Sequence, residues 1–180
     1  MRPGRRRQSG QSIIELAIAT PVLLMMLLSA FNVTVMVSDK VIAGYAARQG
    51  ARLAAEIGGS QTNPTLTTAQ IDADIVKNVL AVANAMNYSQ LLEVDVYRPT
   101  RSDGAITNGD HINAYNASGN SIVGQFGGPG FPISERNQIP PSETSMGVRV
   151  VWQYTPPTSF ASFSITLSEY AVMKASPVLL

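Results

Sequence analysis

The sequence predicts an α+β fold in which a long N-terminal helix and a second helix pack on a small antiparallel sheet. Apolar residues recur three and four positions apart up to Ile57, which is the period of a helix. Thr67 and Gln70 match a capping box at the start of a second stretch with this period. Alternating apolar and polar residues predict strands over 92–97 and 146–154. An antiparallel sheet covered by both helices is the simplest way to bury these patterns.

The first helix is expected to run from about Ser12 to Ile57, a length of roughly 69 Å at 1.5 Å per residue. Gly58-Gly59 would end it, as glycines commonly do at helix C-termini. Gly44 and Gly50 weaken a helix by about 1 kcal/mol each relative to alanine, unless their small size permits close packing.

The later elements follow from local patterns. Asp72 and Asp74 are expected in the first turn of the second helix, where the helix dipole favours acidic side chains. A third extended or helical piece is expected over 163–174, after Pro156-Pro157. The strand at 146–154 is expected to place on one face Val148, Val150, Trp152 and Tyr154.

Composition bounds the chemistry. The 180 residues fit one domain with a tail or anchor, and 45% of them are hydrophobic, which argues against disorder as the dominant state. There is no cysteine, which excludes thiol catalysis, disulfides and cysteine-ligated metal sites. The single histidine, His111, excludes a histidine-rich metal site within one chain. We therefore expect no metal and no cofactor.

The charges are unevenly placed. Four of the 13 basic residues lie in the first seven positions, namely Arg2, Arg5, Arg6 and Arg7. The rest of the chain has nine basic (13 − 4) against 12 acidic residues, a balance of −3. Such a chain offers no basic face, and nucleic acid is not an expected partner.

An apolar run of about 22 residues without a formal charge extends from Leu16 to Val37. As a helix it spans roughly 33 Å, enough for a hydrocarbon core of about 30 Å. The arginines before it predict a single-pass topology with a cytoplasmic N-terminus and everything after about residue 38 outside the cytoplasm. The alternative is a signal peptide cleaved near Ser29-Ala30, but signal h-regions usually have only about 7–15 residues, so a retained helix is favoured.

Two residues do not suit a simple membrane anchor. Glu15 stands at the cytoplasmic start of the run, and a carboxylate at mid-bilayer costs about 2.5–3.5 kcal/mol, so it usually has a partner. Its alternative role is an interfacial carboxylate beside the arginines. Pro21 removes the backbone hydrogen bond to Ala17 and predicts a helix kink, which transmembrane helices commonly tolerate.

The order of these features is similar to a known signal. A basic, polar leader, Arg5-Arg6-Arg7-Gln8-Ser9-Gly10, is followed by Gln11-Ser12-Ile13-Ile14-Glu15 and the apolar helix. This resembles the class III signal of type IV prepilins, and GQSIIELAIATPVLL resembles the TadE-like pseudopilins of the Tad/Flp pilus family. A weaker C-terminal resemblance covers Val148–Tyr154, the prolines that follow, and Met173–Pro177, although Ser176 replaces the family's glutamate.

The resemblance implies a pilin-like fold, with the membrane-spanning first half of the long helix in the filament core. It implies cleavage between Gly10 and Gln11 by a prepilin peptidase, which removes the arginines and places Glu15 at the fifth mature position. Glu15 would pair with a neighbouring subunit's N-terminal ammonium, because two such charges leaving water are tolerable only together. The other implied partners are Tad pilins and pseudopilins, the inner-membrane assembly platform and membrane lipid.

The implied organisation has four parts and one long loop. These are a prepilin-type leader at 1–10, a transmembrane or filament-core helix at 11–38, its amphipathic continuation at 39–58 and an extracytoplasmic head domain at 59–180. The loop at 98–144 is rich in Gly, Asn, Ser and Pro, so it is functional, disordered or contains short strands. Its segment 103–111 imitates a calcium loop but lacks the EF-hand spacing, which favours turn chemistry. An exposed loop of this kind is a candidate contact with neighbours or an adhesion target.

The sequence is compatible with three functions. The first is a TadE-like minor pilin or pseudopilin that takes part in assembly of a Tad-type pilus for adhesion or secretion. The second is an unprocessed single-pass membrane protein with an extracytoplasmic binding domain, in which Gly10 and Glu15 would be freely replaceable. The third, an enzyme, is disfavoured because no nucleophile motif such as G-x-S-x-G occurs and His111 lies in the glycine-rich loop. We expect no catalytic residues.

Overall fold

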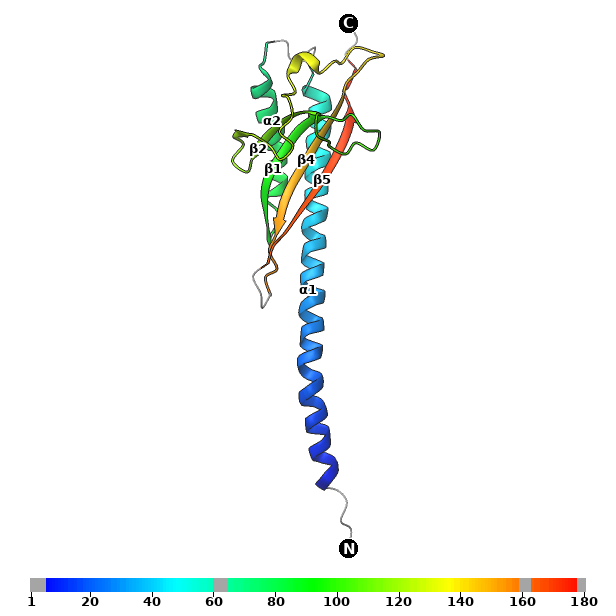
Figure 1. The fold of residues 1–180 in the computed structure, drawn as a ribbon, viewed down its shortest axis with the longest axis vertical. Coiled ribbons are helices and arrows are strands. Elements are labelled where there is room, and N and C mark those ends of the chain that lie inside the picture. The colour runs from blue at the N-terminus through cyan, green and yellow to red at the C-terminus, as the bar shows by residue number, and fades with distance from the viewer. Residues whose placement is uncertain (1–5, 60–64, 159–162, 178–180) are drawn as a thin grey trace.

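A computed structural model of the chain describes residues 6–59, 65–158 and 163–177, with side chains from Gln11 onward. It has the expected α+β fold, in which a head domain packs against one end of a long helix and the other end projects alone (Figure 1). The elements in chain order are α1 (Arg6–Ile57), α2 (Thr68–Ala83), β1 (Ser89–Arg98), β2 (His111–Asn116), β3 (Ser121–Ile122), the 3₁₀ turn η1 (Ile133–Glu135), β4 (Ser145–Tyr154) and β5 (Ile165–Lys174).

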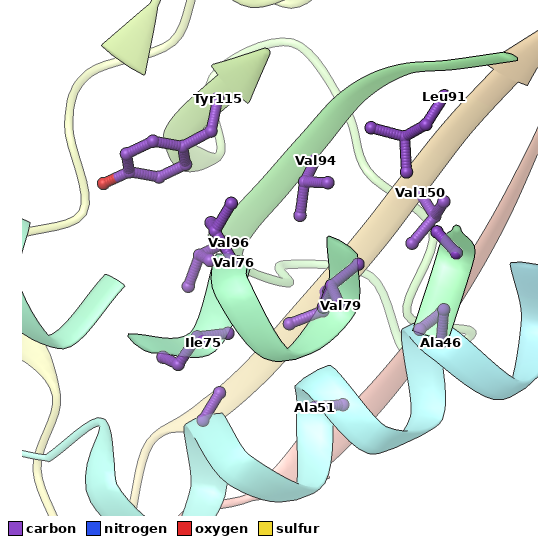
Figure 2. Packing of buried hydrophobic residues seen from close by; sticks show 14 of the residues in the cluster. Ala46, Ala51, Ile75, Val76, Val79, Leu91, Val94, Val96, Tyr115 and Val150 are labelled. Carbon is purple, nitrogen blue, oxygen red and sulfur yellow. The ribbon is translucent and has the colours of Figure 1, made fainter. Parts of the chain in front are cut away.

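The five strands form one antiparallel sheet in the order β3-β2-β1-β4-β5. The strands expected at 92–97 and 146–154 are confirmed as parts of β1 and β4, and the piece at 163–174 is a strand, β5. As expected, one face of β4 carries Val148, Val150, Trp152 and Tyr154, all buried in the main hydrophobic core. The helices pack on this face (Figure 2).

The second half of α1 meets the head through small residues. Five alanines of this half are fully buried, namely Ala43, Ala46, Ala47, Ala51 and Ala54. At Gly50, α1 lies very close to α2 and β4. A Cβ atom added there would stand 2.5 Å from Val79 Cγ2 of α2 and 3.0 Å from Val148 Cγ1 of β4. Close packing therefore explains Gly50. Gly44 is different, because an added Cβ would meet only the Arg48 guanidinium at an ordinary 3.5 Å and Glu169 at 4.0 Å.

α1 differs from expectation at its N-terminal end. α1 begins at Arg6, before the expected Ser12, because arginine and glutamine are good helix formers. Its expected end at Ile57 is confirmed, and the Gly58 N–H donates to the Ala54 carbonyl at 2.8 Å. The capping box of Thr67 and Gln70 is also confirmed.

The expectation that Asp72 and Asp74 lie in the first turn of α2 was wrong. α2 begins at Thr68, so both follow the first turn, which contains no acidic residue. Asp72 is fully buried because it has a partner far along the chain: its carboxylate accepts from the Arg136 guanidinium at 2.6 and 3.0 Å. This pair fastens α2 to the segment that follows η1.

The segment 98–144 contains short strands, which was one of its three expected forms. β2 and β3 extend the sheet beyond β1, and Tyr115 of β2 donates its hydroxyl to Asp72 at 2.8 Å. Asn113 donates to the same carboxylate at 2.7 Å and to the Phe131 carbonyl at 2.9 Å. The segment is thus held to α2 by buried polar contacts as well as by strand pairing.

Asp39 ties α1 to the start of the sheet. It is 1% exposed, and its carboxylate accepts from the backbone N–H groups of Asn87 and Tyr88, both at 3.2 Å, and from the Ser89 hydroxyl at 2.7 Å. Three donors compensate the burial of this charge. The contact fixes the height of the sheet along α1.

The two glycines of α1 provide a matched test of this packing. Gly50→Ala should lower the free energy of unfolding by about 1–3 kcal/mol, because the methyl group meets two branched side chains that cannot swing away. Gly44→Ala should leave it unchanged or raise it by up to about 1 kcal/mol through helix propensity. Trp152 is the single tryptophan and is fully buried, so its fluorescence during denaturation of the full chain in detergent measures both changes. Equal effects of the two substitutions would contradict the assigned contact.

Candidate functional site

The N-terminal half of α1 is an apolar helix with no cover. Its most apolar 18-residue window has a mean hydropathy of 2.2, and none of that window is buried. Ile13 is 67% exposed and Met26 is 68% exposed, as large side chains are along the whole segment. So much contiguous apolar surface marks an interaction site. By length and composition the helix can cross a membrane.

The uncovered stretch is shorter than the apolar run of the sequence. Leu28 and Asn32 are partly covered, and Val35 and Met36 pack against the core of the head. The predicted boundary at residue 38 between the spanning helix and its amphipathic continuation stays a prediction. The head already contacts α1 within the last turns of 11–38.

Glu15 is the single charged residue between positions 8 and 38. It is exposed, and it accepts a hydrogen bond from the side-chain amide of Gln11 at 3.1 Å, one helical turn away. Among the residues whose side chains the structure describes, no cation pairs with it. The structure thus places Gln11 and Glu15 on one face of α1, and the carboxylate is available to a partner from outside the chain.

Hydroxyl groups in the apolar segment are satisfied within the helix. Thr20 donates to the Leu16 carbonyl at 2.7 Å, Ser29 to Met25 at 2.8 Å and Thr34 to Ala30 at 2.9 Å. Each bond links a residue to the fourth residue before it, as is common for Ser and Thr in helices. These side chains need no water, which suits a lipid or protein environment.

α1 continues through Pro21 as one helix. Proline has no N–H, so the Ala17 carbonyl lacks its usual donor. The kink assigned to Pro21 stays a prediction. A shallow apolar groove runs along this part of the helix and is lined by Glu15, Ile18, Ala19, Val22, Leu23 and Met26. Gly10 lies within α1, so the bond between Gly10 and Gln11 is inside the helix, and its cleavage also stays a prediction.

The residues that imitate a calcium loop are occupied by turn contacts. Asp110 accepts from the Thr107 N–H at 2.8 Å and the Thr100 hydroxyl at 2.6 Å. Asp103 accepts from Arg101, and this hydrogen bond lowers the pKa of Asp103 to about 2. His111 is the first residue of β2, and its Nδ1 atom lies 2.6 Å from the carboxylate of Glu135 in η1. Within the described ranges, no group of three or more acidic or histidine side chains is placed to hold a metal ion.

A buried charge cluster on the other face of the sheet was missed by sequence reasoning. Arg149 donates through Nε to Asp95 at 2.5 Å and through Nη2 to Glu93 at 3.1 Å. It also donates to Gln125 at 3.2 Å and lies 4.6 Å from the Phe126 ring centre. The cluster fastens the loop after β3 across β1 and β4. The alternation of apolar and polar residues along β1 and β4 places these charged residues on the face of the sheet away from the helices. It does not show that a loop covers them.

Asp95 is fully buried, and burial together with the nearby Glu93 carboxylate raises its pKa to about 7, against the lowering effect of Arg149. Its contacts join β1, β4 and the loop after β3, so the cluster links these parts of the head.

Comparison with known proteins finds a family similarity in the N-terminal segment. The family model described as TadE-like protein matches residues 10–52, which is 43 residues (52 − 10 + 1) of the 180. The match begins at Gly10, contains Gln11, Glu15 and Pro21, and extends into the alanine-rich face that packs against the head. It confirms the resemblance to TadE-like proteins. No curated protein and no solved structure matches the chain.

Asp95 should make the stability of the head depend on pH. Its pKa is about 7 in the folded chain and about 3.9 in an unfolded one. Between these values the folded state binds more protons, so the free energy of unfolding falls as pH rises from about 4 to about 7, by at most ~1.4 kcal/mol per pH unit. Asp95→Asn should flatten this slope, and the exposed Asp74→Asn is the matched control. Denaturation followed by Trp152 fluorescence measures it, and an unchanged slope in Asp95→Asn would contradict the assignment.

Proposed function

We propose that this chain is a TadE-like minor pilin or pseudopilin of a Tad-type pilus. A prepilin peptidase cuts it between Gly10 and Gln11, and the mature chain takes part in pilus assembly for adhesion or secretion. The proposal rests on the observation that three features occupy the same segment. The TadE-like match begins at Gly10 and includes the exposed apolar part of α1, in which the single charged residue is Glu15.

Before cleavage, the helix holds the chain in the inner membrane with its N-terminus in the cytoplasm. The leader arginines at positions 2, 5, 6 and 7 keep that end in place, because positive charges are retained on the cytoplasmic side. Cleavage removes these four charges and creates an ammonium at Gln11. The end of the helix is then far less strongly held at the membrane surface.

In the assembly, the uncovered face of α1 packs against the helices of neighbouring pilins. Glu15 has no cationic partner among the described side chains, and an apolar groove runs from it along the helix. The Gln11 ammonium of a neighbour supplies the missing positive charge. A buried carboxylate and ammonium are each costly alone and tolerable together, so the pair sets the register of neighbouring helices.

The protein's role in this account is structural, and we assign it no reaction of its own. Its partners are the prepilin peptidase, other Tad pilins or pseudopilins, the inner-membrane assembly platform and membrane lipid. The head domain contributes the surface that the assembly presents outside the membrane.

Removing the carboxylate tests the pairing. Glu15→Gln keeps the size of the side chain and its contact with Gln11 but removes the charge, and Glu15→Ala removes both. Both variants should insert and be cleaved, yet be largely lost from sheared filaments, while Glu15→Asp should keep part of the incorporation. The readout is the amount of this chain in the filament fraction relative to the membrane fraction. Normal incorporation of Glu15→Gln would defeat the pairing.

The leader offers a matched pair of glycines for the cleavage. Gly10→Val should leave an uncut precursor in the membrane, because the peptidase accepts glycine before the scissile bond. Gly4→Val, six positions earlier in the same leader, should be cut normally. Electrophoretic mobility and N-terminal sequence distinguish the two forms. Normal processing of Gly10→Val would remove the basis for the cleavage site.

A further inference from the structure

The lower end of the head touches α1 inside the apolar run. Tyr154, the last residue of β4, donates its hydroxyl to the Asn32 carbonyl at 2.9 Å. Thr158, in the connection that follows β4, donates to the Asn32 side-chain oxygen at 2.9 Å. In Figure 1 the ends of β4 and β5 that lead into this connection are the part of the sheet nearest to the projecting half of α1.

The position of Asn32 sets the distance between head and membrane. The stretch from Ser12 to Phe31 has 20 residues (31 − 12 + 1), which as a helix is about 30 Å long. This equals the thickness of a typical hydrocarbon core. Because the head contacts α1 at Asn32, the last six residues of the apolar run lie beside the head, and the span proposed here is 12–31 instead of 16–37. The outer boundary of the membrane then lies at Asn32, and no length of helix remains as a spacer below the head.

The chemistry of the connection suits that boundary. No charged residue occurs from position 150 to 168, a stretch that includes the whole connection. On its described flanks Phe163 is 51% exposed and Ile165 is 40% exposed. After Glu15, the first charges along α1 are Asp39 and Lys40, about 10 and 12 Å beyond Asn32. Lys40 lies 3.7 Å from Glu169, the first charged residue of β5, so the first charges on this strand also lie above the level of Asn32.

We propose that the two described flanks of the β4–β5 connection, 155–158 and 163–165, lie in the lipid headgroup layer and bind the membrane surface by Phe163 and Ile165. The inference rests on the proposed membrane span of α1, with which this apolar surface is continuous. The head then contacts the membrane beside its helix as well as through it. This second contact fixes the rotation of α1, and with it the direction in which Glu15 faces neighbouring helices.

Single cysteines can test this, because the chain has none of its own. Ser164→Cys places a probe beside Phe163, and Val22→Cys places one near the middle of the uncovered helix. Ser102→Cys is the matched control, since it is exposed beyond the far end of β1, about 33 Å along the sheet. Each full-length variant carries an environment-sensitive fluorophore in phosphatidylcholine–phosphatidylglycerol vesicles. Nitroxide quenchers are attached either to the lipid headgroup or to the middle of the acyl chain.

The proposal predicts that the probe at Ser164→Cys loses fluorescence mainly to the headgroup quencher. The probe at Val22→Cys should lose it mainly to the acyl-chain quencher, and the probe at Ser102→Cys to neither. Quenching at Val22→Cys with none at Ser164→Cys would overturn the surface contact while leaving the membrane span intact. Absence of quenching at Val22→Cys would instead remove the membrane span, and the proposed anchoring with it.

A charge at the contact provides a second test. Phe163→Asp in the Ser164→Cys background should reduce headgroup quenching, because a carboxylate is disfavoured beside the anionic lipid surface. Trp152 fluorescence, from the fully buried side chain of β4, shows whether the head is still folded. Unchanged quenching in a folded Phe163→Asp variant would overturn the role given to Phe163.

Discussion

The structure depends on one contact, the close packing of the small-residue face of α1 against α2 and β4. Gly50 and the buried alanines allow the helix to approach the head without bulky side chains between them. Asp39 then fixes the height of the sheet through three hydrogen bonds. Because α1 is one helix from Arg6 to Ile57, fixing its second half also fixes the position of everything on its first half. The heights of Glu15 and Asn32 relative to the head follow from this packing.

The two halves of α1 lie in different environments. One face of the second half is covered by the head, and the small side chains on that face give shape complementarity. Within the part of the chain that the structure describes, most of the first half is exposed, and its hydroxyls are satisfied internally, so lipid or other helices can surround it. A lone carboxylate on an apolar surface costs free energy when lipid or other helices surround it, unless it has a partner. Glu15 therefore requires a partner there, although it is exposed in the single chain. In our proposal one residue thereby couples membrane anchoring to assembly.

Local patterns predicted much of this structure, but not its long-range polar contacts. The period of α1, the capping box at Thr67 and the alternation in β4 each arise within a few residues, and all were found. β3 has only two residues and β2 only six, too short for a clear pattern in a glycine-rich segment. The pairs Asp72–Arg136 and Asp95–Arg149 join residues 64 and 54 positions apart, and no local pattern says which charges will be buried together. For the candidate site, the sequence supplied Gly10, Gln11, Glu15 and Pro21, while the contact of the head with Asn32 required the structure.

The central claim is that the leader is removed and the chain acts as a processed pilin subunit. The most direct test is the N-terminal residue and intact mass of the protein isolated from its own host. The account predicts a mature chain that begins at Gln11, with or without a methyl group on its amine. A chain that begins at Met1 would contradict it and would leave an unprocessed single-pass protein whose head domain binds an extracytoplasmic partner.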